Sequence, residues 1–343
     1  MTASDSATTP PAAPGLVAVT GAEGFIGSHL TEALVARGHR VRAMAQYNSF
    51  SSYGWLETLA PDVLDQVEIV LGDVRDPGSV QRLTQGAEAV YHLAALIAIP
   101  YSYQAPHSYV DTNVTGTLNV LEAVRQQEIP RLVHTSTSET YGTAQTVPIT
   151  EDHPINTQSP YAASKAGGDR LADSYHASFG TPVVTLRPFN TFGPRQSMRA
   201  VIPTVIGQVA AGARTVTLGD LRPTRDFLYV GDTAQAFVAV GTAPAADVVG
   251  RTFNAGTGEE ISIGELTRLI GKLMETDLDV REDPARIRPA DSEVMRLVAD
   301  ASRLRAATGW APRDDLETGL ERAIAFFRDP ANLARYKTGI YNI

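Results

Sequence analysis

The sequence predicts an α/β protein built on a doubly wound parallel sheet, with a smaller C-terminal α/β region. An apolar run at residues 16–20 has the pattern of a buried strand and leads directly into a glycine-rich turn and a helical pattern. Further apolar runs at residues 39–45, 67–71 and 89–95 alternate with helical patterns, as repeated β-α-β units do. The 343 residues suit one large domain or two intimate ones with a sizeable core.

Composition excludes several classes of protein. The 29 Lys and Arg against 38 Asp and Glu give a net charge of −9, which argues against nonspecific binding to nucleic acid or to an anionic membrane. Without cysteine there is no disulfide framework and no thiolate nucleophile, and we predict no metal site. Residues 1–15 lack a signal-peptide pattern and no apolar run has transmembrane length, so we expect a cytoplasmic protein with a disordered N-terminal tail over these residues.

The glycine turn after the first strand predicts a phosphate-binding site. Gly21, Gly24 and Gly27 are spaced G-x-x-G-x-x-G, and a helix begins at the second glycine. Glycines permit a tight turn, close approach of a pyrophosphate and close helix packing, while the N–H groups of the helix start attract phosphates. We therefore expect a Rossmann-type dinucleotide site that includes Phe25 and Ile26.

The end of the second strand should select between NAD and NADP. Folds that prefer NAD usually place Asp or Glu there for the ribose hydroxyls. This chain has Gln46, Tyr47 and Asn48 instead, and it has no arginine pair for a 2′-phosphate because Arg42 is expected within the strand. We favour NAD, with Gln46 or Asn48 as a neutral substitute for the carboxylate, and NADP is not excluded.

Two segments carry the candidate catalytic groups. Tyr161 and Lys165 share one face of a helix expected over residues 160–179. A strand at residues 132–133 opens into the hydroxyls and the carboxylate of residues 135–139. Because a nearby ammonium favours the phenolate, Lys165 is expected to make Tyr161 a general base near neutral pH.

The glycine spacing and the Tyr-x-x-x-Lys pair together resemble the extended short-chain dehydrogenase/reductase superfamily of NAD-dependent epimerases and dehydratases, over residues 16–327. The resemblance implies that Asp73 binds the adenine, although Asp73 could instead cap the helix that begins near Pro77. His92 is expected to be a core histidine. The resemblance also assigns to the cofactor site Val74, Leu93, Ala94, Ala95, Asn113 in a helix over residues 109–121, Tyr161, Lys165 and Pro188.

The same resemblance implies a nucleotide-sugar site. The R-P-F-N-x-x-G-P segment makes Asn190 a substrate ligand, and the R-D-F-x-Y-V-x-D segment makes Arg225 a contact for the diphosphate or ribose. An ion pair between Arg225 and Asp226 is the structural alternative. A second basic contact is expected at Arg288. The other expected substrate contacts are Val201, Ile202 and Leu218.

Two intertwined domains follow from the resemblance. An NAD-binding domain is expected over residues 16–190, with residues 229–256 returning to it, and a nucleotide-sugar domain over residues 191–228 and 257–337. Trp310 is expected in the core, and a homodimer packed through two helices is expected by resemblance alone.

Glu139 should separate the activities of this superfamily. A simple 4-epimerase needs only Thr137, Tyr161 and Lys165, and commonly has a small residue where Glu139 stands. After oxidation at C4 by the bound NAD, a carboxylate could remove the C5 proton, with Ser138 or Glu139 assisting the loss of the C6 hydroxyl, which is the 4,6-dehydratase pattern. A local capping or pairing role is the alternative for Glu139.

The Thr-Ser-Glu form of the motif, at residues 137–139, reduces the number of enzymes that the chain resembles but does not select one. dTDP-glucose 4,6-dehydratases have Thr-Asp-Glu, whereas GDP-mannose 4,6-dehydratases and UDP-glucuronate decarboxylases share Thr-Ser-Glu. Over residues 47–56, 135–139 and 219–227 the chain is most similar to UDP-N-acetylglucosamine 4,6-dehydratases of nonulosonic acid pathways. We therefore predict that reaction on a UDP-linked sugar, with a UDP-sugar 4-epimerase, a UDP-glucuronate decarboxylase or a 5,6-dehydratase of an antibiotic pathway as alternatives. A non-catalytic NAD-sensing protein is disfavoured by the intact catalytic residues.

Overall fold

The computed structural model describes residues 15–287 and 289–342. The expected N-terminal tail, except Gly15, and the expected substrate contact Arg288 lie outside the described residues. No helix in the described part of the chain is both long and apolar enough to span a membrane.

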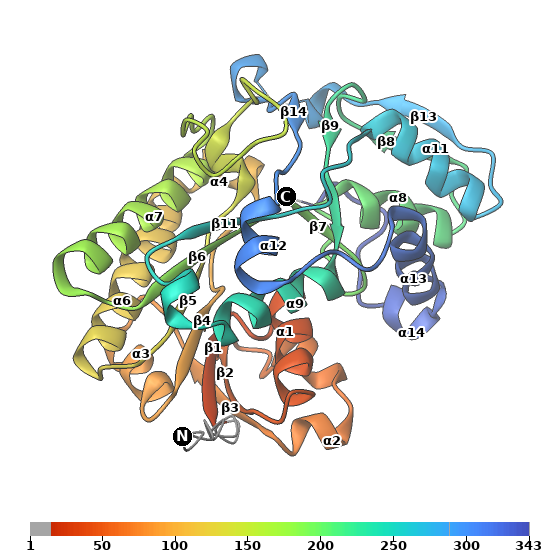
Figure 1. Ribbon diagram of the computed structural model, residues 1–343. Helices are drawn as coiled ribbons and strands as arrows, with labels where there is room; N and C mark the ends of the chain where they lie inside the picture. Colours follow the sequence, from red (N-terminus) through yellow and green to blue (C-terminus); the bar gives the residue numbers. More distant parts are fainter. Residues whose placement is uncertain (1–14, 288, 343) are drawn as a thin grey trace, which may run out of the picture.

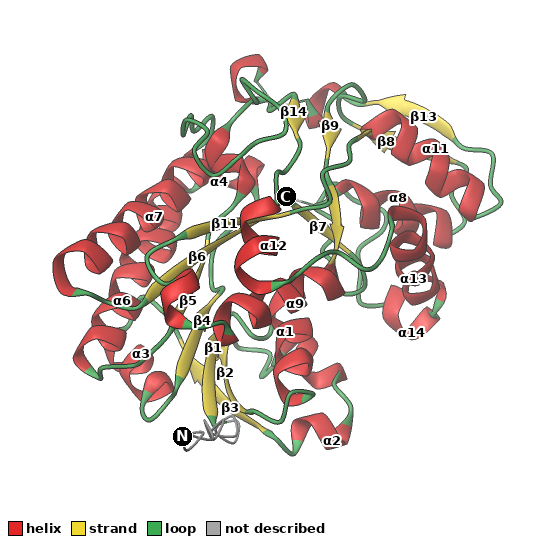
Figure 2. Cartoon of the chain, viewed as in Figure 1, coloured by secondary structure: helices red, strands yellow, loops and turns green. Residues whose placement is uncertain are grey.

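A seven-stranded parallel sheet forms the centre of the larger half, which confirms the predicted fold class (Figure 2). Its order, β11-β6-β5-β4-β1-β2-β3, starts from β1 in the middle and winds outward in both directions. Such a reversal of winding places a crevice at the carboxyl ends of the strands. The strands are β1 (Leu16–Thr20), β2 (Arg40–Gln46), β3 (Val67–Gly72), β4 (Ala89–His92), β5 (Leu132–Thr135), β6 (Val183–Pro188) and β11 (Thr252–Ala255).

Helices cover both faces of this sheet (Figure 1). One face is covered by α1 (Phe25–Val35), α9 (Val230–Thr242) and α12 (Ser302–Thr308), and the other by α3 (Pro77–Thr84), α6 (Gly116–Gln126) and α7 (Pro160–Phe179). The shorter elements of this half are η1 (Gly54–Thr58), α2 (Pro61–Leu64), α4 (Ile99–Gln104), α5 (Pro106–Tyr109), η2 (Val110–Thr115), η3 (Ser138–Tyr141) and α10 (Ala245–Val248).

The smaller half of the molecule has a second apolar core of its own. It is formed mainly by α8 (Val201–Ala210), α11 (Ile263–Leu273) and α13 (Leu316–Arg328), and α11 begins at a capping box of Ser262 and Glu265. Short strands connect this core to the sheet. These strands and the remaining turns are β7 (Asn190–Phe192), β8 (Thr215–Leu218), β9 (Thr224–Arg225), β10 (Phe227–Tyr229), β12 (Ile261–Ser262), β13 (Asp279–Glu282), η4 (Pro284–Arg286), η5 (Ala290–Ser292), β14 (Arg296–Leu297) and α14 (Pro330–Leu333).

Two expected elements differ from the observed ones. The fourth strand, expected over residues 89–95, stops at His92, and the small residues that follow it form a loop at the carboxyl end of this central strand. The single helix expected over residues 109–121 is divided, because a π-helical turn at η2 separates α5 from α6. Trp310 is buried as predicted, and its indole N–H donates to the backbone oxygen of Asp232.

Candidate active site

A cavity of about 670 Å³ opens at the carboxyl ends of the central strands and extends to α8 and β8 of the smaller half. The sequence-predicted site residues that the structure describes line it, with the exceptions of Asn48 and Asn113. They are Gly21, Gly24, Phe25, Ile26, Gly27, Gln46, Asp73, Val74, Leu93, Ala94, Ala95, Thr137, Ser138, Glu139, Tyr161, Lys165, Pro188, Asn190, Val201, Ile202, Leu218 and Arg225.

Two glycines of the turn, Gly21 and Gly27, leave no room for a side chain. Gly21 has a φ of +66°, and a Cβ there would lie 2.8 Å from the backbone nitrogen of Ala94. A Cβ at Gly27 would lie 2.1 Å from the carbonyl oxygen of Gly21. The N-cap of α1 is Gly24, which has no side chain to cap the first N–H groups of the helix, and this helix start lines the cavity. The turn therefore fits the pyrophosphate of a dinucleotide.

A buried histidine fixes the loop opposite the glycine turn. The hydroxyl of Thr20 accepts the N–H groups of Leu93 (3.0 Å) and Ala94 (3.1 Å), so its own proton goes to Nδ1 of His92, 2.8 Å away. Nε2 of His92 then donates to the Thr117 hydroxyl (3.0 Å). Burial holds the pKa of His92 well below its ordinary value, in agreement with the predicted core histidine.

Thr137, Tyr161 and Lys165 meet where β5 and α7 approach each other. Ser159 caps α7 by accepting the N–H of Ala162 (3.1 Å), and this fixes the first turn that carries Tyr161. The Thr137 side chain hydrogen-bonds to the phenol. The Nζ of Lys165 donates to the backbone oxygen of Thr135 (2.6 Å).

Opposing influences act on the ionisation of Tyr161 and Lys165. Burial raises the pKa of Tyr161, the hydrogen bond from Thr137 lowers it only in part, and the negative charge of Glu139 raises it further. Burial lowers the pKa of Lys165 to about 8. Burial of the pair therefore opposes the phenolate, and the prediction that Lys165 makes Tyr161 a general base near neutral pH stays a prediction.

A buried polar network centred on Asp169 connects α7, the helix that carries Tyr161 and Lys165, to the sheet. Asp169 lies 3.0 Å from Nε2 of His134 and accepts hydrogen bonds from Ser136 (2.6 Å) and Arg187 (2.8 Å). Burial alone would raise the pKa of Asp169, but these partners hold it well below its usual range. The network connects α7 to β5 and β6, and thereby fixes the positions of the strand ends that line the cavity.

Asn113 lies behind the wall of the cavity, so the assignment of this residue to the cofactor is corrected. Its side-chain amide donates to the backbone oxygen of Leu96 and to the hydroxyl of Ser164, both at 2.9 Å, and its oxygen accepts the N–H of Leu96 (2.9 Å). All its hydrogen-bonding groups are engaged in joining the loop after β4 to α7. This position at the π-helical turn agrees with a bracing role.

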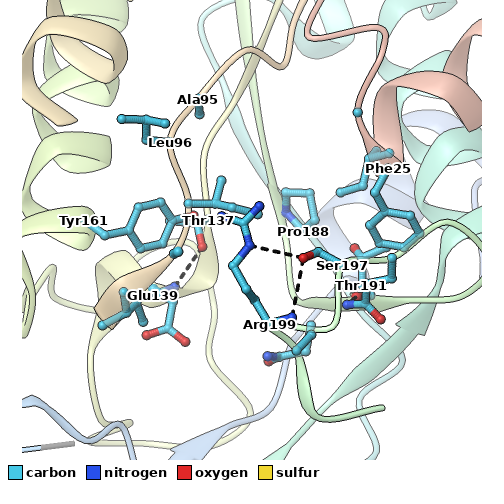
Figure 3. Close-up of a pocket in the computed structure, with 18 of the residues that line it drawn as sticks. Phe25, Ala95, Leu96, Thr137, Glu139, Tyr161, Pro188, Thr191, Ser197 and Arg199 are labelled. Atoms are coloured by element: carbon cyan, nitrogen blue, oxygen red, sulfur yellow. Dashed lines mark hydrogen bonds between the residues drawn. The ribbon is translucent and has the colours of Figure 1, made fainter. Parts of the chain in front are cut away.

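Glu139 presents a carboxylate to the cavity, on the same side as Thr137 and Tyr161 (Figure 3). Its backbone N–H donates to the Thr137 hydroxyl (3.3 Å), so Thr137 is the N-cap of η3 and Glu139 is not a cap. Within the described residues, its carboxylate forms no ion pair or side-chain hydrogen bond, which removes the alternative of local pairing. Ser138 is buried beside it.

The far end of the cavity lies over β2 and β3. The carboxylate of Asp73 lines it and forms a two-point ion pair with Arg75, with contacts of 2.6 and 3.0 Å. Asp76, and not Asp73, caps α3. Asn48 does not line the cavity, because its side chain accepts the N–H groups of the following loop, so its proposed role as a carboxylate substitute is wrong.

A different set of polar groups lines the side of the cavity that faces the smaller half. Asn190 lines the cavity, and its side-chain oxygen is buried without a hydrogen-bond partner among the described residues. Arg225 also lines the cavity and pairs with Glu293 (3.2 Å). Asp226 does not pair with Arg225; it accepts hydrogen bonds from the loop at Thr257.

Sequence reasoning missed several residues that line the cavity. Arg199 reaches into the middle of the site, where its Nε donates to the Ser197 hydroxyl (3.1 Å) (Figure 3). Tyr341 and Asn342 return from the C-terminal end to the same cavity, beyond the last residue assigned to a domain. Glu23, inside the glycine turn, was also missed. A carboxylate at that position of the motif was the available signal for Glu23, whereas nothing local marked the C-terminal residues.

A dinucleotide-binding fold whose cavity is lined by Thr137, Tyr161 and Lys165 defines the short-chain dehydrogenase/reductase class. The model of the family described as GDP-mannose 4,6 dehydratase matches residues 18–323, and the chain therefore belongs to this family of NAD-dependent epimerases and dehydratases.

Relatives of the chain carry both activities. It is 35% identical to a UDP-glucose 4-epimerase of Mycolicibacterium smegmatis, over 91% of this chain and 98% of the relative. It is 34% identical to a dTDP-glucose 4,6-dehydratase of Xanthomonas campestris pv. campestris, over 90% of this chain and 92% of the relative. The fold is similar to that of DesIV, a dTDP-glucose 4,6-dehydratase from Streptomyces venezuelae, whose double mutant was solved with NAD and DAU bound. The TM-score is 0.84 at 29% identity, and the match covers 93% of this chain and 98% of that one. The chain is thus an enzyme of the nucleotide-sugar epimerase and dehydratase class.

Proposed function

We propose that the protein is a nucleotide-sugar 4,6-dehydratase that acts on UDP-N-acetylglucosamine with NAD as its cofactor. The observation that carries the proposal is the Glu139 carboxylate, which lines the cavity next to Thr137 and Tyr161 without an ion-pair partner among the described residues. A 4-epimerase has no proton to remove from C5, so it needs no such group. A carboxylate beside the sugar provides a base for that proton.

The residues present fit a bound NAD. Gly21, Gly24 and Gly27 would hold the pyrophosphate, the loop of Leu93 and Ala94 would lie under the dinucleotide, and Lys165 would face the nicotinamide ribose. When bound, NAD would supply the transient acceptor for the C4 hydride and the positive charge of its nicotinamide ring.

The chain's own groups then divide the proton transfers. Thr137 would hold O4 of the sugar, and Tyr161, as the phenolate that the Lys165 charge would favour, would take the O4 proton. Glu139 would remove the C5 proton, which is acidic once C4 is a ketone, and Glu139 or Ser138 would assist the departure of the C6 hydroxyl as water. The hydride taken from C4 would then be returned to C6, and a proton would add at C5. Because the cofactor would thus end each cycle in its starting form, the reaction needs no external oxidant or reductant.

The opposite side of the cavity suits a nucleoside diphosphate. The unpartnered oxygen of Asn190 offers an acceptor, and Arg225 and Arg199 offer guanidinium groups, which bind phosphate oxygens at two points. The preference for a UDP-linked N-acetylated sugar rests on the resemblance over residues 47–56 and 219–227.

Product mass tests the proposal directly. The purified protein is incubated separately with UDP-N-acetylglucosamine, UDP-glucuronate and dTDP-glucose. Loss of one water from the first sugar, with no net change in NAD, is the expected result. Loss of carbon dioxide from the second would make the protein a decarboxylase, and an unchanged mass with a new C4 epimer would make it an epimerase.

A further inference from the structure

Glu23 supplies the carboxylate that the end of β2 lacks. It lies between the first two glycines of the turn, where sequence reasoning expected only spacing residues. Its side chain lines the same end of the cavity as Gln46, the last residue of β2. In dinucleotide folds this strand end is where the adenosine ribose is bound by a carboxylate.

The carboxylate is held in place by its surroundings. Its Oε1 accepts the backbone N–H of Gln46 (3.1 Å), which ties the glycine turn to the strand end. The backbone oxygen of Glu23 accepts the N–H of Trp55 (3.0 Å), and a Cβ at Gly54 would come within 2.7 Å of that oxygen. The loop after β2 therefore packs on Glu23 and limits its freedom.

One carboxylate oxygen still needs a donor. Oε2 of Glu23 is buried and has no hydrogen-bond partner among the described residues, and burial raises the pKa of the side chain. A buried acceptor without a donor is unfavourable, so a ligand that brings hydroxyl groups would be bound preferentially. A vicinal diol, as in ribose, offers two such donors.

Charges at this end of the cavity oppose a phosphate. Arg75 lies there, but its guanidinium is already engaged at two points by Asp73. Arg42 does not line the cavity and pairs with Glu68 (2.8 Å). A 2′-phosphate would thus meet the Glu23 carboxylate. Among the described residues, Arg75 and Arg42 are both already paired with carboxylates.

We propose that Glu23 binds the 2′- and 3′-hydroxyls of the adenosine ribose and makes the protein selective for NAD over NADP. The inference rests on the proposed function, since it requires a bound dinucleotide. It replaces Gln46 and Asn48 as the group that determines this choice. The selectivity then comes from the glycine turn and not from the strand.

Dissociation constants for NAD⁺ and NADP⁺, measured by calorimetry on the full chain, test the role of Glu23. The change Glu23→Gln keeps an oxygen for the N–H of Gln46 but removes the charge. It should weaken NAD⁺ binding by about 10- to 100-fold and reduce the preference over NADP⁺ by at least about tenfold. Glu23→Asp keeps the charge, so it should keep the discrimination against NADP⁺ even if NAD⁺ binds less tightly.

The matched control is Glu57→Gln. Glu57 accepts the N–H of Tyr53 (2.7 Å) in the same loop but does not line the cavity, so both constants should stay unchanged. An undiminished preference for NAD⁺ in folded Glu23→Gln would overturn the inference while leaving the proposed function standing. Failure of the wild-type protein to bind either nucleotide would overturn both.

Discussion

Replacing Glu139 with Gln should separate the two chemical stages of the proposed reaction. The change removes the negative charge and the basic oxygen but keeps the size of the side chain. The backbone N–H of Glu139 still donates to the Thr137 hydroxyl (3.3 Å), so the group that would hold O4 is not displaced. Loss of a positioned base costs about 10²- to 10⁴-fold in rate, equivalent to about 3–5 kcal/mol of activation free energy.

Two measurements distinguish the stages. Formation of the dehydrated sugar, followed by mass, should fall by that factor, whereas C4 oxidation, followed in a single turnover by the absorbance of reduced nicotinamide, should persist. Because removal of the Glu139 charge also takes away an influence that raises the pKa of Tyr161, oxidation should not become slower. Glu317→Gln, an exposed change in α13 outside the cavity, is the matched control. Unchanged dehydration in Glu139→Gln would refute the role of this carboxylate.

Three further changes test other parts of the site. Because the pKa of Lys165 is lowered to about 8, its ammonium is present below that pH, and kcat/KM should decline as the pH rises through about 8. Lys165→Met should lower kcat/KM by about 10²-fold or more at neutral pH. A flat alkaline profile of the wild-type protein would contradict a role for the charge. Asp169→Asn leaves Arg187 buried without its charge partner and should lower the free energy of unfolding in urea by about 3–5 kcal/mol. The pKa of Asp169 is depressed in the folded state, so its contribution is present above about pH 4 and is lost as the pH falls, and a wild-type stability independent of pH in that range would contradict it. Removing the residues after Gly339 takes Tyr341 and Asn342 from the cavity and should raise KM for the nucleotide sugar, whereas an unchanged KM would show that they do not contact it.

Local signals gave the most accurate predictions. The catalytic helix was expected over residues 160–179 and forms α7 over that range, because Pro160 occupies its first turn after the Ser159 cap and Gly180 ends it in the left-handed conformation. The parallel sheet was predictable for the same reason, since buried strands and glycine turns are marked within a few residues.

Features that depend on distant contacts were not predictable. The contact between Glu23 and Gln46 exists only because β1 and β2 pair in parallel and bring the glycine turn to the end of the next strand. The return of the C-terminal residues to the cavity likewise depends on packing of the smaller half. The proximity of Tyr161 and Lys165 was visible in the sequence, but their burial, which raises the pKa of the phenol and lowers that of the ammonium, was not. The two-domain division and the homodimer stay predictions.

The central claim is that hydrogen leaves C4 and returns at C6 while water is lost. UDP-N-acetylglucosamine carrying deuterium at C4 tests it most directly, with the product analysed by mass and NMR. The account predicts a 4-keto product that has lost one water and carries the deuterium at C6. Deuterium that remains at C4, in a sugar of unchanged mass or in a 5,6-unsaturated one, would contradict it and assign the protein to the epimerases or to the 5,6-dehydratases.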